Sequence, residues 1–270
     1  MNLLLQTAAQ AAARYGVDCC GICPLGQMSH LLDCRKKALV PPSGSVITML
    51  LPYYTGEWRR RNVALYAVPD DYHRIAGGIL TRVADKLRAE FPQNSFTAFV
   101  DSSPIPEVEA ACLCGLGFRG KNGQLISKEY GSMTFIGEIV TDMEMREYEP
   151  PAPWASCGAC RRCLDACPAG ALGKDGPDSG HCRSAITQKK GELTLWEQQE
   201  IKDGGLVWGC DCCTLACPHN EKLKNTAVAG LLDNLTPTVT EETLGELLTA
   251  KSYGWRGAAV LRRNLAIVNK

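Results

Sequence analysis

Apolar residues along the chain follow two periods, one typical of helices and the other of buried strands. They recur every three or four residues over 3–15, 71–91 and 106–114, which predicts three amphipathic helices. Asp70 or Asp71 can cap the second helix, and Pro92 follows its end. Short β-branched or apolar runs over 17–23, 45–52, 96–101 and 133–141 predict strands. We therefore predict an α+β fold whose first part is an α/β domain.

A proline-rich segment, EPPAP at 149–153, separates this part from a cysteine-rich part. We predict three regions: an α/β domain over 1–148, a ferredoxin-like domain over 149–225 and a helical tail over 226–270. The most apolar stretch, 46–54, is far shorter than the roughly 20 residues of a membrane-spanning helix. The N-terminal segment lacks the basic leader of a signal peptide, so we expect a cytoplasmic protein.

The composition changes this picture in one respect. The chain is 45% hydrophobic and 21% charged, and its 29 basic residues balance 29 acidic ones. A net charge of zero disfavours a protein that grips nucleic acid through a broad excess of positive charge. The 15 cysteines are unusual. In a reducing compartment, clustered cysteines are more often metal ligands than disulfides.

The cysteines between 157 and 217 follow the spacing of bacterial ferredoxins. Residues 157–168 read Cys-x2-Cys-x2-Cys-x3-Cys-Pro, and residues 210–218 repeat all but one cysteine of that run. In two-cluster ferredoxins the fourth cysteine of a run binds the other cluster. The isolated Cys182 can supply the missing ligand. We therefore predict two 4Fe–4S clusters, one on Cys157, Cys160, Cys163 and Cys217 and the other on Cys167, Cys182, Cys210 and Cys213.

Zinc is the alternative metal, but zinc sites usually show separate Cys-x2-Cys pairs rather than this dense run. Cys212 lies between two proposed ligands, and exchanging it with Cys213 would break the spacing, so we interpret it as a spare thiol. We interpret the remaining cysteines near positions 19–23 and 112–114 as small buried hydrophobes rather than a third metal site.

Several long motifs, in one order from about residue 18 to 220, resemble the epoxyqueuosine reductase family and, more remotely, the iron–sulfur reductive dehalogenases. They are DYH at 71–73, FVDSSPIPEVEAACLCGLGFRGKNGQLI at 99–126, GSMTFIGEIVTD at 131–142, CGACRRCLDACPAGAL at 157–172 and WGCDCCTLACPHN at 208–220. The resemblance implies an oxidoreductase that reduces epoxyqueuosine in tRNA to queuosine. It also implies a base-off cobalamin in the first domain, fed by the nearer cluster, and an electron donor such as a flavodoxin or ferredoxin.

The same resemblance assigns Asp101, in the VDS motif, the role of proton donor to the departing oxygen. Such an acid needs a raised pKa near neutral pH, which a water-poor site provides. The alternative is that Asp101 caps the following helix. Three other residues also have purely structural alternatives. Asp71 can serve only as a helix cap, His73 can be a surface residue of that helix, and the Lys121 side chain can be solvated. Candidate contacts to cobalamin or substrate are Tyr72, His73, Gly120, Lys121, Asn122 and Ser132.

Members of this family commonly continue into C-terminal helical repeats that help to hold tRNA. Here we expect residues 258–269 to form only the first helix of such a region, so tRNA contact is expected to be reduced. Two alternatives therefore stay open. One is a cobalamin and iron–sulfur reductase of a small epoxide or organohalide. The other is a two-cluster protein that relays electrons to a partner.

Overall fold

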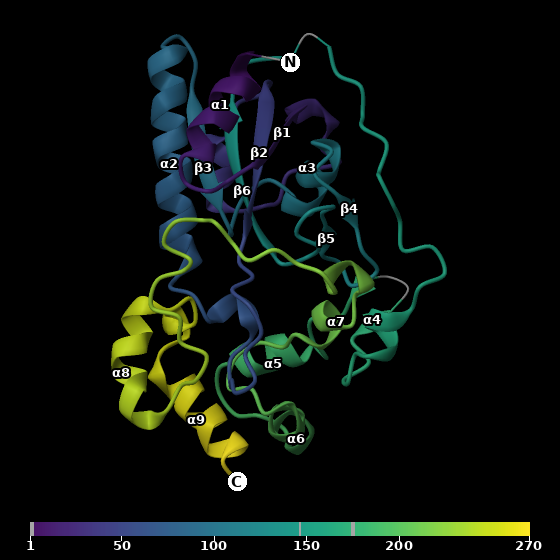
Figure 1. Ribbon diagram of the computed structural model, residues 1–270, viewed down its shortest axis with the longest axis vertical. Helices are drawn as coiled ribbons and strands as arrows, with labels where there is room; N and C mark the ends of the chain where they lie inside the picture. The colour runs from purple at the N-terminus through teal and green to yellow at the C-terminus, as the bar shows by residue number, and fades with distance from the viewer. Residues whose placement is uncertain (1–2, 146, 174–175) are drawn as a thin grey trace.

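A four-stranded sheet organises the first half of the chain in the computed structural model, which describes residues 3–145, 147–173 and 176–270. The strands lie in the order β1 (Cys19–Pro24), β2 (Ser45–Pro52), β6 (Thr134–Thr141) and β3 (Phe96–Val100), and each neighbouring pair is antiparallel (Figure 1). Every residue of β2 is buried, because this strand is paired on both edges and covered on both faces.

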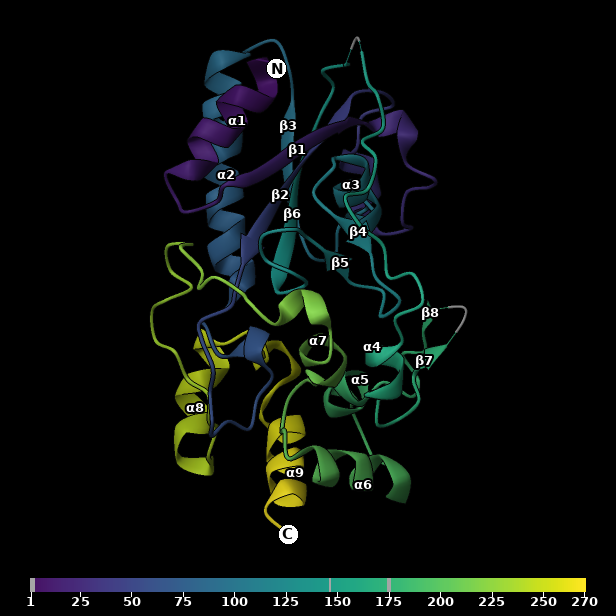
Figure 2. The ribbon, with the colours of Figure 1, turned by 45° about the vertical axis from the view of Figure 1, so that its right-hand side comes forward.

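Helices cover the two faces of this sheet unequally. The helices α1 (Leu3–Ala13) and α2 (Tyr72–Glu90) pack together on one face, and the short α3 (Glu107–Leu113) lies on the other (Figure 2). On the α2 face, a Cβ atom at Gly137 would lie 2.4 Å from Cδ1 of Leu80, so only glycine lets α2 approach β6 this closely. A short hairpin, β4 (Phe118–Arg119) and β5 (Leu125–Ile126), follows α3.

The predicted mixed α/β class is confirmed, and the element ends differ from expectation by a few residues. The strand β1 begins at Cys19 rather than at residue 17, since Gly16 turns the chain with φ +77°. The strand β3 ends at Val100, so Asp101 lies in the loop that follows it. Hydrophobic periodicity did not reveal that the sheet is wholly antiparallel, because strands of either direction can form a buried apolar run.

The cysteine-rich part has little regular structure and is built from short elements. The longest, α6 (Leu195–Gly204), begins at a capping box of Thr194 and Glu197 and ends at Gly205 in the left-handed conformation. The other elements are α4 (Arg162–Asp165), β7 (Leu172–Gly173), β8 (Gly176–Pro177), α5 (Arg183–Gln188) and α7 (Cys212–Leu215). Single 3₁₀ turns lie at Leu25–Gln27, Arg35–Leu39, Leu65–Ala67, Pro218–Asn220 and Gly254–Arg256.

The tail forms two helices, α8 (Glu241–Ala250) and α9 (Ala258–Val268), the second of which was predicted. Both pack around Trp208 and Tyr253, together with residues 63–68 of the first half of the chain. The buried Lys251 fixes this contact, because its Nζ lies 3.1 Å from Oδ1 of Asp70 and donates to the Val68 carbonyl at 3.0 Å. The proposed region boundaries at 148 and 225 stay a prediction.

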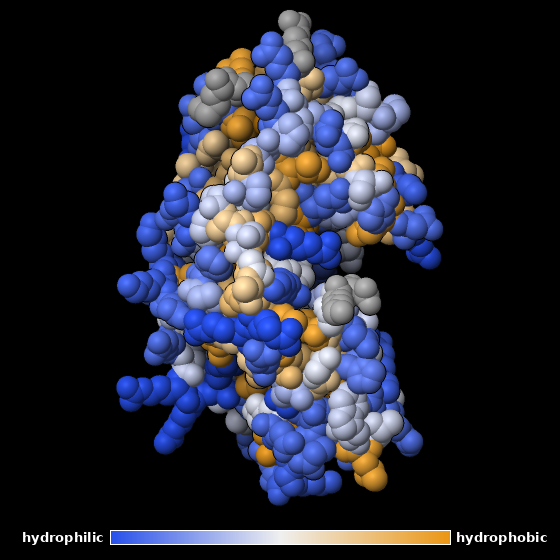
Figure 3. Space-filling view, turned by 90° about the vertical axis from the view of Figure 1, so that its right-hand side faces the viewer, coloured by the Kyte–Doolittle hydropathy of each residue, from blue (hydrophilic) through white to orange (hydrophobic). Residues whose placement is uncertain are grey.

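The surface is hollowed between the sheet and the cysteine-rich part, on the face of α4 and the β4–β5 hairpin (Figure 3). Polar residues predominate on this face. Of the helices in the described ranges, none has both the length and the apolar character to cross a bilayer.

Candidate functional site

Asp101 stands in a strained turn between β3 and α3. Its φ is +47° and that of Ser102 is +33°, a left-handed conformation that residues other than glycine rarely adopt. Such strain is characteristic of functional loops, where the surrounding structure holds the backbone in place. No side chain caps α3, whose N-cap is Pro106. The alternative that Asp101 caps this helix is therefore wrong.

His73 joins Asp101 to the start of α2. Its Nδ1 lies 2.6 Å from Oδ1 of Asp71, and its Nε2 lies 3.1 Å from Oδ2 of Asp101. Asp71 also accepts a hydrogen bond from the His73 backbone amide, so its predicted role as the helix cap is confirmed. His73 is more than a surface helix residue, because both ring nitrogens are engaged.

The charges of this pair differ from the sequence-based expectation. Hydrogen bonds that the His73 ring donates to Asp101 and Asp71 raise the pKa of His73 to about 9, although burial opposes the shift. The same bond from His73 lowers the pKa of Asp101, and partial burial does not offset it. The expectation that Asp101 has a raised pKa is therefore wrong. Near neutral pH the pair holds one proton, and it resides on the imidazole.

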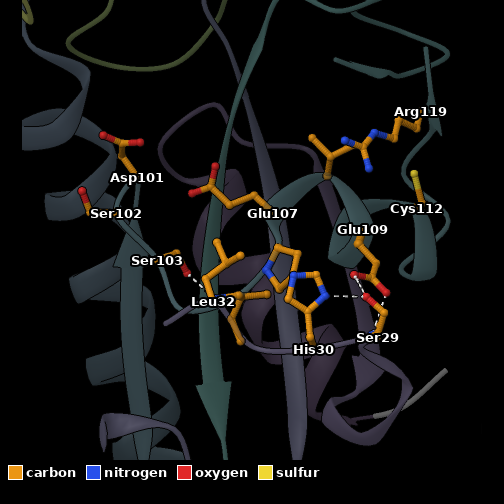
Figure 4. A pocket seen from close by; sticks show the side chains of 13 residues that line it. Ser29, His30, Leu32, Asp101, Ser102, Ser103, Glu107, Glu109, Cys112 and Arg119 are labelled. Atoms are coloured by element: carbon orange, nitrogen blue, oxygen red, sulfur yellow. Dashed lines mark hydrogen bonds between the residues drawn. The ribbon is translucent and has the colours of Figure 1, made fainter. Parts of the chain in front are cut away.

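Two cavities meet at Asp101. The larger, about 750 Å³, extends from Asp101 towards Arg119, with Glu107 pointing into it between them (Figure 4). The smaller, about 310 Å³, is lined by aromatic side chains, including Tyr72, and by Gln124 and Ser132. The Tyr72 ring stacks on Phe135 with centroids 3.9 Å apart. Glu107 and Asp101 line both cavities.

The structure brings the first predicted cysteine set together. Its four members, Cys157, Cys160, Cys163 and Cys217, line one enclosed space of about 60 Å³. Burial raises the pKa of the Cys217 thiol, and the other three thiols raise it further. Four thiols facing one small space suit a cubane, whose four irons each take one thiolate.

The second predicted set is also convergent. Burial raises the pKa of Cys213 to about 11, with smaller contributions from Cys210, Cys182 and Cys167. Cys212 lies beside Cys210, which lowers its pKa to about 7. Within the described residues, no three His, Cys, Asp or Glu side chains converge tightly enough for a single metal ion, and all 15 cysteines are unpaired.

Residues that line the smaller cavity are in direct contact with the cysteine-rich part of the chain. The Thr214 hydroxyl, next to Cys213, donates to Oε1 of Gln124 at 3.1 Å, and Gln124 lines the smaller cavity. The Asn220 side chain binds the backbone amide and hydroxyl of Ser132 at 2.8 and 2.9 Å. A Cβ at the neighbouring Gly131 would lie 1.8 Å from the Asn220 oxygen, so glycine is required there.

The other residues predicted to contact cobalamin or substrate interact with neighbouring residues of the protein instead. Lys121 is not a free solvated side chain, because its Nζ donates to the carbonyls of Gly158 and Cys160 at 2.7 and 2.8 Å. It therefore supports the loop of the first cysteine set. Asn122 is buried against Gln124. Gly120 packs against Asn122 and Ile126, with no room for a Cβ.

Three acidic residues important to the site were not singled out from the sequence. Asp211 is buried beside the cysteines and pairs with Arg61 at 2.7 Å. Glu107 lines both cavities, and Glu138, in the middle of β6, is fully buried. A carboxylate inside an apolar strand such as MTFIGEIVT is the one sequence signal that could have identified Glu138.

Two family models match the chain. Residues 34–102 match "Epoxyqueuosine reductase QueG, DUF1730", and residues 156–220 match "4Fe-4S double cluster binding domain". The predicted pair of 4Fe–4S clusters is therefore confirmed as the cofactor class of this region.

Curated relatives agree with these matches. The chain is 34% identical over 247 residues to an epoxyqueuosine reductase of Synechocystis sp., covering 84% of each protein. It is 34% identical over 221 residues to that of Lactococcus garvieae, covering 77% of this chain but 61% of the relative. The chain thus spans about three fifths of the longer relative.

Solved structures share the whole fold. The epoxyqueuosine reductase from Streptococcus thermophilus superposes with a TM-score of 0.79 at 26% identity, covering 99% of this chain and 81% of that one. An epoxyqueuosine reductase with an epoxyqueuosine-modified tRNA stem loop gives 0.79 at 23% identity, covering 97% and 80%. A reductive dehalogenase described in terms of B12-dependent dehalogenation gives 0.52 at 18% identity, covering 95% and 35%, and shares the fold. On the strength of its sequence relatives, this chain belongs to the epoxyqueuosine reductase family.

Proposed function

We propose that this chain is an iron–sulfur and cobalamin-dependent reductase that removes the epoxide oxygen of epoxyqueuosine in tRNA. Asp101 carries the proposal, because a strained turn holds it at two cavities and His73 supplies it with a proton. A protein that only relayed electrons would need no such acid–base pair beside a cavity. Family membership supports the reaction class over the reduction of a small organohalide.

The two cysteine sets would hold the clusters with the ligands predicted from the sequence. The set with Cys213 lies nearer the smaller cavity, through the contact of Thr214 with Gln124. The two cavities that meet at Asp101 together offer room for a large flat cofactor, and stacked aromatic rings and a buried hydroxyl line the smaller one. Tyr72 and Ser132 would contact cobalamin there. When bound, cobalamin supplies a reduced centre strong enough to open an epoxide.

The protein's own contribution is to orient the substrate and deliver protons. Conversion of an epoxide to an alkene consumes two electrons and two protons, and the oxygen leaves as water. The imidazolium of His73 would pass one proton through Asp101 to that oxygen, because Nε2 and Oδ2 are 3.1 Å apart. Asp71 keeps the ring oriented from the other side through its bond to Nδ1.

Two binding partners follow from this reaction: the tRNA that carries the substrate and a protein that donates the two electrons. The solved complex of a structural neighbour with a modified tRNA stem loop supports tRNA as the substrate, which would place the reaction in the cytoplasm. The clusters would take single electrons from a small donor such as a flavodoxin or ferredoxin.

The test is turnover after anaerobic reconstitution with iron, sulfide and cobalamin. Wild-type protein should convert epoxyqueuosine in a tRNA stem loop to queuosine when given a low-potential reductant. Asp101→Asn should lower the rate by about 10²–10⁴-fold while leaving the cluster spectrum unchanged. No conversion by fully loaded wild-type protein, or conversion of a small epoxide instead, would refute the proposal.

A further inference from the structure

Three carboxyl groups at and behind the cavity interact electrostatically with one another. Asp101 is at the cavity, Glu107 is the first residue of α3, and Glu138 lies beneath it on β6. Figure 4 shows the Glu107 carboxyl turned towards Asp101. Glu138 is fully buried, the Ser103 hydroxyl lies near its carboxyl group, and neither carboxyl oxygen makes a hydrogen bond of normal geometry within the described residues. Oε1 of Glu107 makes no such bond either.

A buried carboxyl group next to other carboxylates is costly to ionise. Burial and, to a smaller extent, the charge of Asp101 together raise the pKa of Glu107 to about 7. The Asp101 backbone amide, His73 and Lys36 act in the opposite direction. Burial, the neighbouring Glu107 and, to a smaller extent, Cys114 and Asp101 also hold the pKa of Glu138 well above its ordinary value, although a hydrogen bond from Ser103 acts in the opposite direction. Glu107 is therefore partly protonated near neutral pH, and Glu138 is protonated.

The reaction needs one proton more than the His73–Asp101 pair holds. That pair carries a single proton near neutral pH, because the pKa of Asp101 is lowered while that of His73 is raised. The oxygen accepts two protons as it leaves as water. A second acid at the same cavity would supply this proton, and Glu107 is the half-buried carboxyl that lines both cavities together with Asp101.

We propose that Glu107, backed by the buried Glu138, is the second proton donor of the reductive step. This inference rests on the proposed function. The C–O bonds of the epoxide break as two electrons arrive from the donor protein, and an alkene forms; the clusters, when bound, would carry those electrons. One proton comes from the His73–Asp101 pair and the other from Glu107, so that water leaves. Glu138 keeps its proton and prevents a second negative charge from forming directly beneath Glu107.

The first experiment needs neither substrate nor turnover. Infrared difference spectra of the holoprotein, titrated between about pH 5 and pH 9, report protonated carboxyl groups directly. Wild-type protein should show a carboxylic acid band that disappears with a midpoint near 7, as its Glu107 ionises. This band should be missing from Glu107→Gln and retained in the control Glu90→Gln, which alters an exposed carboxylate paired with Lys86. A wild-type spectrum without a carboxyl group titrating near this pH would overturn the inference.

The second experiment is the pH dependence of turnover on the tRNA stem loop. The wild-type rate should fall above about pH 7, and Glu107→Gln should be about 100-fold slower and lack this limb of the profile. Glu107→Asp should recover part of the rate. If wild-type protein turns over and Glu107→Gln keeps both rate and profile, this inference fails while the proposed function stands. If loaded wild-type protein does not turn over at all, the proposed function fails, whatever the infrared result.

Discussion

Asn220 connects the cysteine-rich part to the cavity, and its removal should have a large effect. Its side chain accepts from the Ser132 backbone amide at 2.8 Å and donates to the Ser132 hydroxyl at 2.9 Å and the Thr214 carbonyl at 2.7 Å. Both partners are almost fully buried. Asn220→Ala leaves their polar atoms without partners and out of reach of water. Each lost hydrogen bond costs about 1 kcal/mol, so the free energy of unfolding should fall by about 3 kcal/mol.

This loss can be measured as a change in melting temperature. For a protein of this size, 1 kcal/mol corresponds to a shift of about 2–4 °C, so the variant should melt about 6–12 °C lower. Far-UV circular dichroism of the anaerobic holoprotein, at one scan rate for all variants, gives the comparison. The control is Asn94→Ala, which removes an exposed bond to Asp142 and should shift the midpoint by less than about 2 °C. Equal midpoints for the two variants would refute the reasoning.

Two further predictions concern the cysteines and the imidazole. Cys217→Ser removes a predicted ligand and should abolish one of the two cluster signals in electron paramagnetic resonance. Cys212→Ser changes a cysteine outside the predicted ligands and should keep both signals. Loss of a cluster signal in Cys212→Ser would contradict the ligand assignment. Because the pKa of His73 rises on folding from 6.5 to about 9, its contribution to stability is fully present below pH 6.5 and disappears as the pH rises through 9. Urea unfolding should therefore show His73→Gln to be less stable than wild type by about 1 kcal/mol near pH 6, after allowance for solvent screening, with little difference near pH 10. A difference that is constant with pH would contradict the ion pairing.

Much of the fold follows from local patterns. The apolar run of β2, the helical period of α2 and its Asp71 cap appear where the sequence predicts them, because local spacing determines each of them. The presence of two clusters was likewise predictable, since cluster ligation imposes a fixed spacing on neighbouring residues, whereas the assignment of ligands to each cluster stays a prediction. The tail helix α9 was expected from the family resemblance rather than from periodicity.

Long-range contacts account for what the sequence did not reveal. The charge state of Asp101 depends on His73, which is 28 residues away, and not on the apolar residues beside it. Lys121 was a candidate cofactor contact but supports the backbone of the first cysteine loop. Glu107 and Glu138 meet only because α3 lies across β6. No periodicity in a single sequence reports such a meeting, since the two residues are far apart along the chain.

Metal analysis of the anaerobically reconstituted protein tests the central claim most directly. Iron, sulfide and cobalt are counted on one gel-filtered sample, and its absorption spectrum is recorded. These measurements report whether the two cysteine sets hold clusters while the cavity beside them holds cobalamin. The account predicts iron and sulfide for two 4Fe–4S clusters and one cobalt retained per chain. Zinc in place of iron, or cobalamin that separates completely from cluster-loaded protein, would contradict it.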